Sequence, residues 1–170
     1  MIKRSCISVL IIFMLALMGC GAGNEHLNSG IDSQGSIKTP DEAMTFYIEK
    51  IEPDRWGQGD YYTGAYKIID TKEVADKLII YASVLSEWVD KNGNMVSGGT
   101  DFAQITFQKS NGDYLYEKSV SFLPQWISDS SEIPQSVKDK LAIDNESHYL
   151  EMRAEMDQQI EDYRAERQGH

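Results

Sequence analysis

Hydrophobic residues recur at helical spacing just after Thr39-Pro40-Asp41-Glu42. Thr39 can cap the first free backbone amides, Pro40 suits the first helical position, and Glu42 completes a capping box. The positions that share one face of this helix are Ala43, Met44, Tyr47, Ile48 and Ile51. The pattern predicts a helix with one buried face, and we expect Glu52-Pro53 to end it.

A second amphipathic stretch runs from about Asn145 to Arg167 near the end of the chain. Charged residues fill most of its surface, and one stripe is apolar: Tyr149, Met152, Met156, Ile160 and Tyr163. Such a stripe is typical of a helix that docks on its own domain. Binding to a partner is the alternative.

Between the two helices the pattern changes to short stretches rich in β-branched and aromatic residues, which predict strands. The predicted strands are 66–70, 77–90, 102–109 and 114–122. Asn92-Gly93 and Asn111-Gly112 are hairpin turn dipeptides, so we expect an antiparallel meander. The predicted fold class is α+β, with the N-terminal helix packed on a curved four-stranded antiparallel sheet and an amphipathic helix after it. We expect these residues to be buried: Tyr47, Ile48, Ile51, Ile80, Val84, Ile105 and Phe107.

The start of the chain has the three parts of an export signal: basic Lys3-Arg4, the uncharged apolar run 7–18, and small Gly19. The run is too short to cross a bilayer as a helix. Leu17-Met18-Gly19-Cys20 resembles the lipobox of bacterial lipoproteins. That resemblance implies cleavage before Cys20, diacylglycerol on its thiol, and a stable anchor on the outer side of the cytoplasmic membrane. An ordinary secretory signal with an incidental cysteine is the alternative.

These features divide the chain into a signal peptide (1–19), a tether after lipidated Cys20 (20–38) and one α+β domain (39–167). Gly, Ser and Asn dominate the tether, which would span roughly 20–25 Å as a random coil. The other cysteine, Cys6, lies in the predicted signal peptide. We therefore expect a mature domain without disulfides.

The chain has 16 Lys and Arg against 27 Asp and Glu, a net charge of −11. Removing Lys3 and Arg4 with the signal peptide brings the mature net charge to −13. Nucleic acid is excluded as a partner, because the acidic surface of the protein and the phosphate backbone of the nucleic acid would repel each other. The acidic surface serves solubility or, alternatively, binds cations or a basic partner.

No catalytic or metal-binding pattern is present in the sequence. The three histidines, His26, His148 and His170, lack metal-ligand spacing, and no nucleophile motif occurs. Residues 90–94 have oxygen ligands at calcium-loop positions, but Met95 stands where such a loop needs glycine, which favours a hairpin turn. We predict no cofactor, no metal and no catalytic residue.

Aromatic residues are the remaining candidates for a binding site. Trp56, Tyr61 and Tyr62 cluster in the loop predicted after the first helix, and Trp126 follows the last predicted strand. Exposed rings on loops suit a sugar or peptide surface, so we predict partner binding through these four residues. The alternative is that the rings plug the open end of the sheet.

The order of elements, with Ser97-Gly98-Gly99 before the third strand, resembles a group of small Gram-positive lipoproteins and secreted proteins of unknown function. In outline, residues 39–122 are similar to cystatin-like and NTF2-like domains. The protease-blocking Gln-x-Val-x-Gly loop of cystatins is absent. The expected function is a non-catalytic binding or accessory domain at the cell envelope, with an envelope protein or the cell wall as partner. The alternatives are an NTF2-like ligand pocket or enzyme that uses carboxylates and tyrosines, and a spacer without a ligand.

Overall fold

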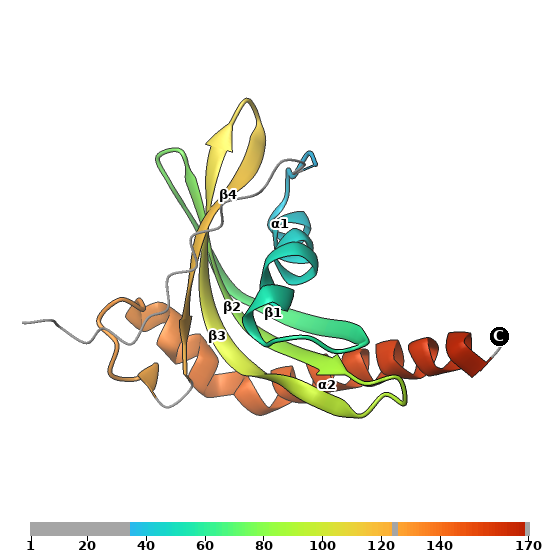
Figure 1. Cartoon of the computed structure of the whole chain (residues 1–170). Helices are drawn as coiled ribbons and strands as arrows, with labels where there is room; N and C mark the ends of the chain where they lie inside the picture. Colours follow the sequence, from blue (N-terminus) through green and yellow to red (C-terminus); the bar gives the residue numbers. More distant parts are fainter. Residues whose placement is uncertain (1–34, 124–125, 169–170) are drawn as a thin grey trace, which may run out of the picture.

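The computed structural model describes residues 35–123 and 126–168, which form the expected α+β fold. The signal peptide, Cys20 and most of the predicted tether lie outside the described residues. A four-stranded antiparallel sheet in the order β1-β2-β3-β4 curves around the first helix, and the last helix runs along the opposite face (Figure 1). The strands are β1 (Tyr61–Val74), β2 (Lys77–Val89), β3 (Met95–Ser110) and β4 (Asp113–Phe122). We call the face toward the first helix the inner face and the other the outer face.

The β2–β3 and β3–β4 hairpin turns lie at Asn92-Gly93 and Asn111-Gly112, as predicted. Asn111 and Gly112 have φ angles of 53° and 89°, the backbone that Asn-Gly favours in a two-residue turn. At the β2–β3 turn, Asp90 Oδ1 accepts the backbone N–H groups of Asn92 and Asn94 at 2.8 and 2.9 Å. The string 90–94 therefore forms a side-chain-capped hairpin turn.

The first helical segment begins as expected, and a short 3₁₀-helix follows it. Both hydrogen bonds of the capping box at Thr39 are present, and α1 spans Pro40–Phe46. The chain then widens into a π-helix, η1 (Tyr47–Ile51), and tightens into a 3₁₀-helix, η2 (Glu52–Arg55). The π-helix ends at Ile51, directly before Glu52-Pro53 as expected, and Pro53 lies in the first turn of the separate 3₁₀ segment, where its missing N–H is not needed.

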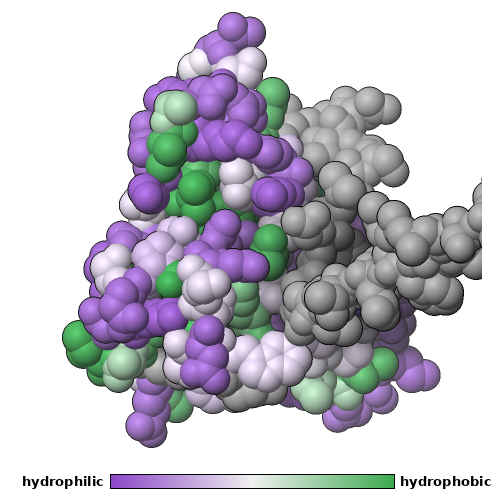
Figure 2. Space-filling view, turned by 90° about the vertical axis from the view of Figure 1, so that its left-hand side faces the viewer, coloured by the Kyte–Doolittle hydropathy of each residue, from purple (hydrophilic) through white to green (hydrophobic). Residues whose placement is uncertain are grey.

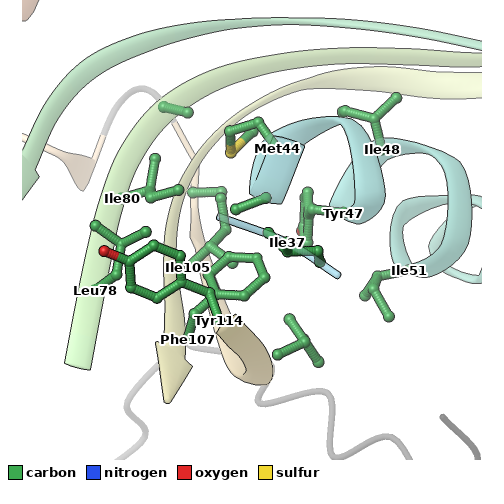
Figure 3. Close-up of a cluster of buried hydrophobic side chains, with 14 of the residues drawn as sticks. Ile37, Met44, Tyr47, Ile48, Ile51, Leu78, Ile80, Ile105, Phe107 and Tyr114 are labelled. Atoms are coloured by element: carbon green, nitrogen blue, oxygen red, sulfur yellow. The ribbon is translucent and has the colours of Figure 1, made fainter. Parts of the chain in front are cut away.

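The inner face carries the main hydrophobic core, which packs α1 and η1 against β2, β3 and β4 (Figure 3). All seven residues expected in the core are buried, at 6% exposure or less: Tyr47, Ile48, Ile51, Ile80, Val84, Ile105 and Phe107. Ile37, from the predicted tether, is also part of this core at 4% exposure. The packed domain thus includes residues just before the capped helix.

The outer face is covered by α2 (Gln135–Gln168), which begins earlier than the pattern indicates. Met152, Met156 and Ile160 are buried, and Leu85 of β2 belongs to the same cluster as the two methionines. Tyr149, expected in the buried stripe, is 42% exposed, so this part of the prediction is wrong. The helix docks on its own domain. No helix among the described residues is both long and apolar enough to cross a membrane.

Candidate functional site

A buried carboxylate, Glu52, is the centre of a polar cluster on the inner face. Its side chain is fully buried and accepts hydrogen bonds from Tyr47 Oη at 2.7 Å and Trp56 Nε1 at 3.0 Å. Ser86 Oγ of β2 donates a longer bond of 3.3 Å. The π-helical bond from Glu52 N–H to the Tyr47 carbonyl aligns these two residues, so their side chains meet.

Arg55 neutralises this carboxylate and links it to the sheet. Its guanidinium lies 3.0 Å from Glu52 Oε1 and 2.6 Å from Asp101 Oδ2 of β3. Burial acts to lower the pKa of Arg55, but the charges of Glu52, Tyr47 and Asp101 outweigh it and raise that pKa. Burial and the Glu52 charge raise the pKa of Tyr47. We call Tyr47, Glu52, Arg55, Trp56, Ser86 and Asp101 the Glu52 cluster.

The cluster joins η2 to β2 and β3 and has its polar groups paired. A carboxylate that works as a general acid or base needs a substrate within hydrogen-bond reach. Here the carboxylate oxygens of Glu52 are bonded to its own neighbours, and the adjoining core fills the concave side. The arrangement is suited to holding the η2 segment on the sheet.

Trp56, one of the four predicted binding aromatics, belongs to this cluster. Its ring is half-buried, and the Arg55 guanidinium carbon lies 5.2 Å from the ring centroid. The ring also packs over Gly99, where a Cβ atom would come within 3.1 Å of it. Gly99 therefore makes room for the indole, which accounts for part of the Ser97-Gly98-Gly99 string.

Tyr61 and Tyr62 lie at the start of β1 and point to opposite faces, as neighbours in a strand must. Tyr61 stacks on Tyr163 of α2 with ring centroids 4.4 Å apart. Tyr62 meets Trp88 edge to face at 5.4 Å on the inner side. Its hydroxyl is buried without a hydrogen bond of normal geometry. Burial, followed by the Glu52 charge, raises the pKa of Tyr62.

Trp126 lies in the connection between β4 and α2 and is 46% exposed. The next residue, Ile127, packs on the outer-face cluster that contains Tyr81, Phe102 and Phe122. The structure thus places Trp56 and Tyr62 on the inner side, Tyr61 on the outer side, and Trp126 on a separate connection. The four rings do not form one surface.

The two residues after Trp126, Ile127 and Ser128, line a hollow on the outer face. This hollow of about 380 Å³ lies between the sheet, the connection and the first turns of α2, and we call it the outer hollow. Its apolar lining residues are Phe102, Ile127, Leu141 and Ala142, with Ser83 and Lys138 among the polar groups. Lys138 Nζ donates to the Ser128 carbonyl at 2.9 Å, which ties α2 to the connection.

Sequence reasoning missed both the Glu52 cluster and the outer hollow. Glu52 follows Ile48 by one helical turn and precedes Arg55 by three residues. A carboxylate on the buried stripe of the helix, with an arginine within reach, was therefore the signal that could have indicated the Glu52 cluster. Nothing local indicates Asp101 or the hollow, because residues far apart in the chain form them. Among the described residues, no group of three His, Cys, Asp or Glu side chains could hold a metal ion.

Compared with known proteins, the chain matches no protein-family model, no curated protein and no solved structure.

Proposed function

We propose that this protein is a bacterial lipoprotein, anchored through lipid on Cys20 to the outer side of the cytoplasmic membrane. Its domain would be a non-catalytic binding or accessory module of the cell envelope. The observation that carries the anchor is Leu17-Met18-Gly19-Cys20 after a basic start and an apolar run. Two acyl chains would hold the protein stably.

The proposed binding role is supported by the outer hollow and by the exposed ring of Trp126, which directly precedes the lining residues Ile127 and Ser128 in the chain. A hollow lined by four apolar and seven polar residues suits an amphipathic segment of an envelope partner. Aromatic residues with one exposed face often carry a large share of binding energy.

The NTF2-like alternative has less support. It needs free carboxylates and tyrosines inside the curve of the sheet, whereas Glu52 is held by Arg55, Tyr47 and Trp56. The curve of the sheet around a helix is in keeping with either proposed resemblance, cystatin-like or NTF2-like, and scaffolds of this kind host many functions.

Crosslinking of the lipidated protein in its own cells, followed by capture of whatever is joined to it, tests the binding role. Trp126→Ala should weaken capture about tenfold or more while the melting temperature stays unchanged. Tyr149→Ala, which removes a similarly exposed ring from α2 (42% against 46%), is the matched control and should capture normally. Trp56→Ala should lower stability instead. Equal capture by wild type and Trp126→Ala would remove Trp126 from the site.

A further inference from the structure

The chain enters the domain at one particular end of the sheet. Tyr114 N–H donates to the Ile37 carbonyl at 2.8 Å, and Ser36 Oγ donates to Asp113 Oδ1 at 2.6 Å. Both partners lie just past the β3–β4 turn. In Figure 1 the first described residues accordingly lie beside the tip of the β3–β4 hairpin, at the top of the view.

Antiparallel topology places the β1–β2 and β3–β4 turns at this same end and the β2–β3 turn at the other. A backbone bond from Lys109 N–H to the Asp76 carbonyl joins the first two turns. At the opposite end, Arg164 of α2 donates to the Asn92 carbonyl at 3.0 Å. β3 has 16 residues, so the two ends lie at most about 50 Å apart.

Neither end of the sheet carries the excess negative charge of the chain, because the β2–β3 turn (89–97) holds one carboxylate, Asp90, and one lysine, Lys91. Residues 72–77 and 109–118, which form the two hairpin ends near Ile37, carry four lysines and four carboxylates, a net charge of zero. The net charge of the whole chain is −11, so the excess negative charge lies elsewhere. Lys77 pairs with Glu117 at 2.7 Å, and Lys109 lies 3.7 Å from Glu73.

The same end exposes apolar side chains. Val74 and Leu115 are 43% and 41% exposed. The register joins Val74 to Lys77, Lys77 to Gln108 and Gln108 to Leu115, so these four residues form one row across the outer face. Figure 2 shows hydrophilic side chains at the upper tip of the molecule with hydrophobic ones on the flank just below.

We infer that the hairpin ends 72–77 and 109–118 form a membrane-facing surface and that the domain stands upright on anionic lipid. This rests on the proposed lipid anchor at Cys20. The fifteen residues between Cys20 and Ser36 would span roughly 22 Å as a random coil, which would keep this end of the domain close to the headgroups. An anionic surface repels the acidic remainder and tolerates the neutral end, with lysines near lipid phosphates and Val74 and Leu115 beside them.

In this orientation the end of the sheet with the β2–β3 turn points away from the membrane, toward the envelope. The β2–β3 turn, with exposed Met95 and Val96 and with Arg164 of α2 bonded to it, would then face away from the lipid. If the domain lay flat on the membrane, both ends of β3 would be at the same distance from the membrane surface.

Energy transfer from single labelled cysteines to headgroup-labelled lipid tests this. Met95→Cys and Ser110→Cys place a donor at the first and last residues of β3, and the lipidated Cys20 thiol is unavailable to the label. The full lipidated chain is reconstituted into vesicles of phosphatidylcholine with phosphatidylglycerol, and into phosphatidylcholine alone. With anionic lipid, the label at residue 110 should transfer about twofold or more efficiently than the label at residue 95, given their separation.

A charge reversal at each end provides the matched variants. Lys72→Glu, in the membrane-facing surface, should lower transfer from residue 110 on anionic vesicles, whereas Lys91→Glu, beside the β2–β3 turn, should not. Equal transfer from both labels, or equal effects of both reversals, would overturn the orientation while leaving the anchor intact. Loss of the protein from the vesicles would overturn the anchor and the orientation together.

Discussion

At the scale of single residues, the Glu52 carboxylate is the group on which the inner face depends most. Glu52→Gln removes the negative charge that faces Arg55 and leaves a buried guanidinium with only Asp101 to balance it. Breaking one side of a buried ion pair typically costs about 3–5 kcal/mol of unfolding free energy. Denaturant unfolding measures the loss.

The control for that substitution is Glu49→Gln, three residues earlier. Glu49 is exposed, at 59% of its side chain, and its ion pair with Lys50 is long at 3.8 Å. We expect a change within about 0.5 kcal/mol. If both variants lose the same stability, the Glu52 cluster does not hold the fold in the way described.

Tyr47 and Tyr62 both lie near the Glu52 carboxylate, but only the Tyr47 hydroxyl makes a hydrogen bond to it. Tyr47→Phe removes the 2.7 Å bond to Glu52 and should cost about 1–3 kcal/mol, since a buried acceptor loses a donor. Tyr62→Phe removes a buried hydroxyl that makes no hydrogen bond of normal geometry and should be neutral or stabilising. Melting temperatures of the two variants compare them directly, and the opposite order would contradict the assigned contacts.

Buried tyrosines also predict how stability responds to alkali. Burial raises the pKa of Tyr47, Tyr62 and Tyr116 in the folded state, whereas unfolded tyrosine has a pKa of about 10. The folded chain therefore keeps protons that the unfolded chain releases. The contribution is fully present below about pH 10 and is lost as pH rises beyond it. The unfolding midpoints of wild type and of Tyr62→Phe can be measured between pH 8 and 12. Both midpoints should decrease once the pH exceeds about 10, and the decrease should be less steep in the variant.

At the scale of elements, turns and the first cap were predictable because their chemistry is local. Asn111-Gly112 and the capping box at Thr39 each need only a few adjacent residues. Strand ends were not predictable: β1 begins at Tyr61 rather than Tyr66 and β3 at Met95 rather than Phe102. Those extra residues gain their hydrogen bonds from neighbouring strands, not from their own β propensity.

The same distinction separates the candidate site from the fold. Glu52 reaches Asp101 only because Arg55 bridges two distant segments, and the outer hollow depends on where the connection after β4 packs. The early start of α2 at Gln135 was missed because its first turns are largely polar. The presence of each helix and strand could be predicted from the local pattern of residues. The lengths of these elements and the geometry of the candidate site depend on tertiary contacts, which the local pattern does not contain.

Docking of α2 on the outer face can be tested with two apolar residues on the helix. Met156 is fully buried and Ile143 is 83% exposed. Met156→Ala should cost about 2–5 kcal/mol through lost burial and the cavity left behind, and Ile143→Ala should change stability by less than about 0.5 kcal/mol. Equal losses measured by urea unfolding would mean that the helix packs by another face.

At the scale of the whole molecule, both faces of the sheet are covered, and the chain enters the domain at one end, beside the β3–β4 turn. The inner face holds α1, η1 and the Glu52 cluster, while the outer face holds α2. Besides the solvent-facing sides of the helices, other molecules can reach the outer hollow, the connection that carries Trp126, and the two ends of the sheet. The proposed anchor would hold such a domain in place and let it present one end, so the function proposed for it depends on that anchor.

Cys20→Ala tests that anchor in the full chain. Without the thiol no diacylglycerol can be attached, so the protein should either leave the membrane fraction or remain as an uncleaved precursor. Among the described residues the core begins at Ile37, which is 4% exposed, so protein released by this change should unfold at the same midpoint as the lipidated form. Membrane fractionation, intact mass and thermal unfolding of wild type and variant give the three readings. An alanine variant that is cleaved after Gly19 and retained like the wild type would show that Cys20 is incidental, and the orientation of the domain would then need another cause.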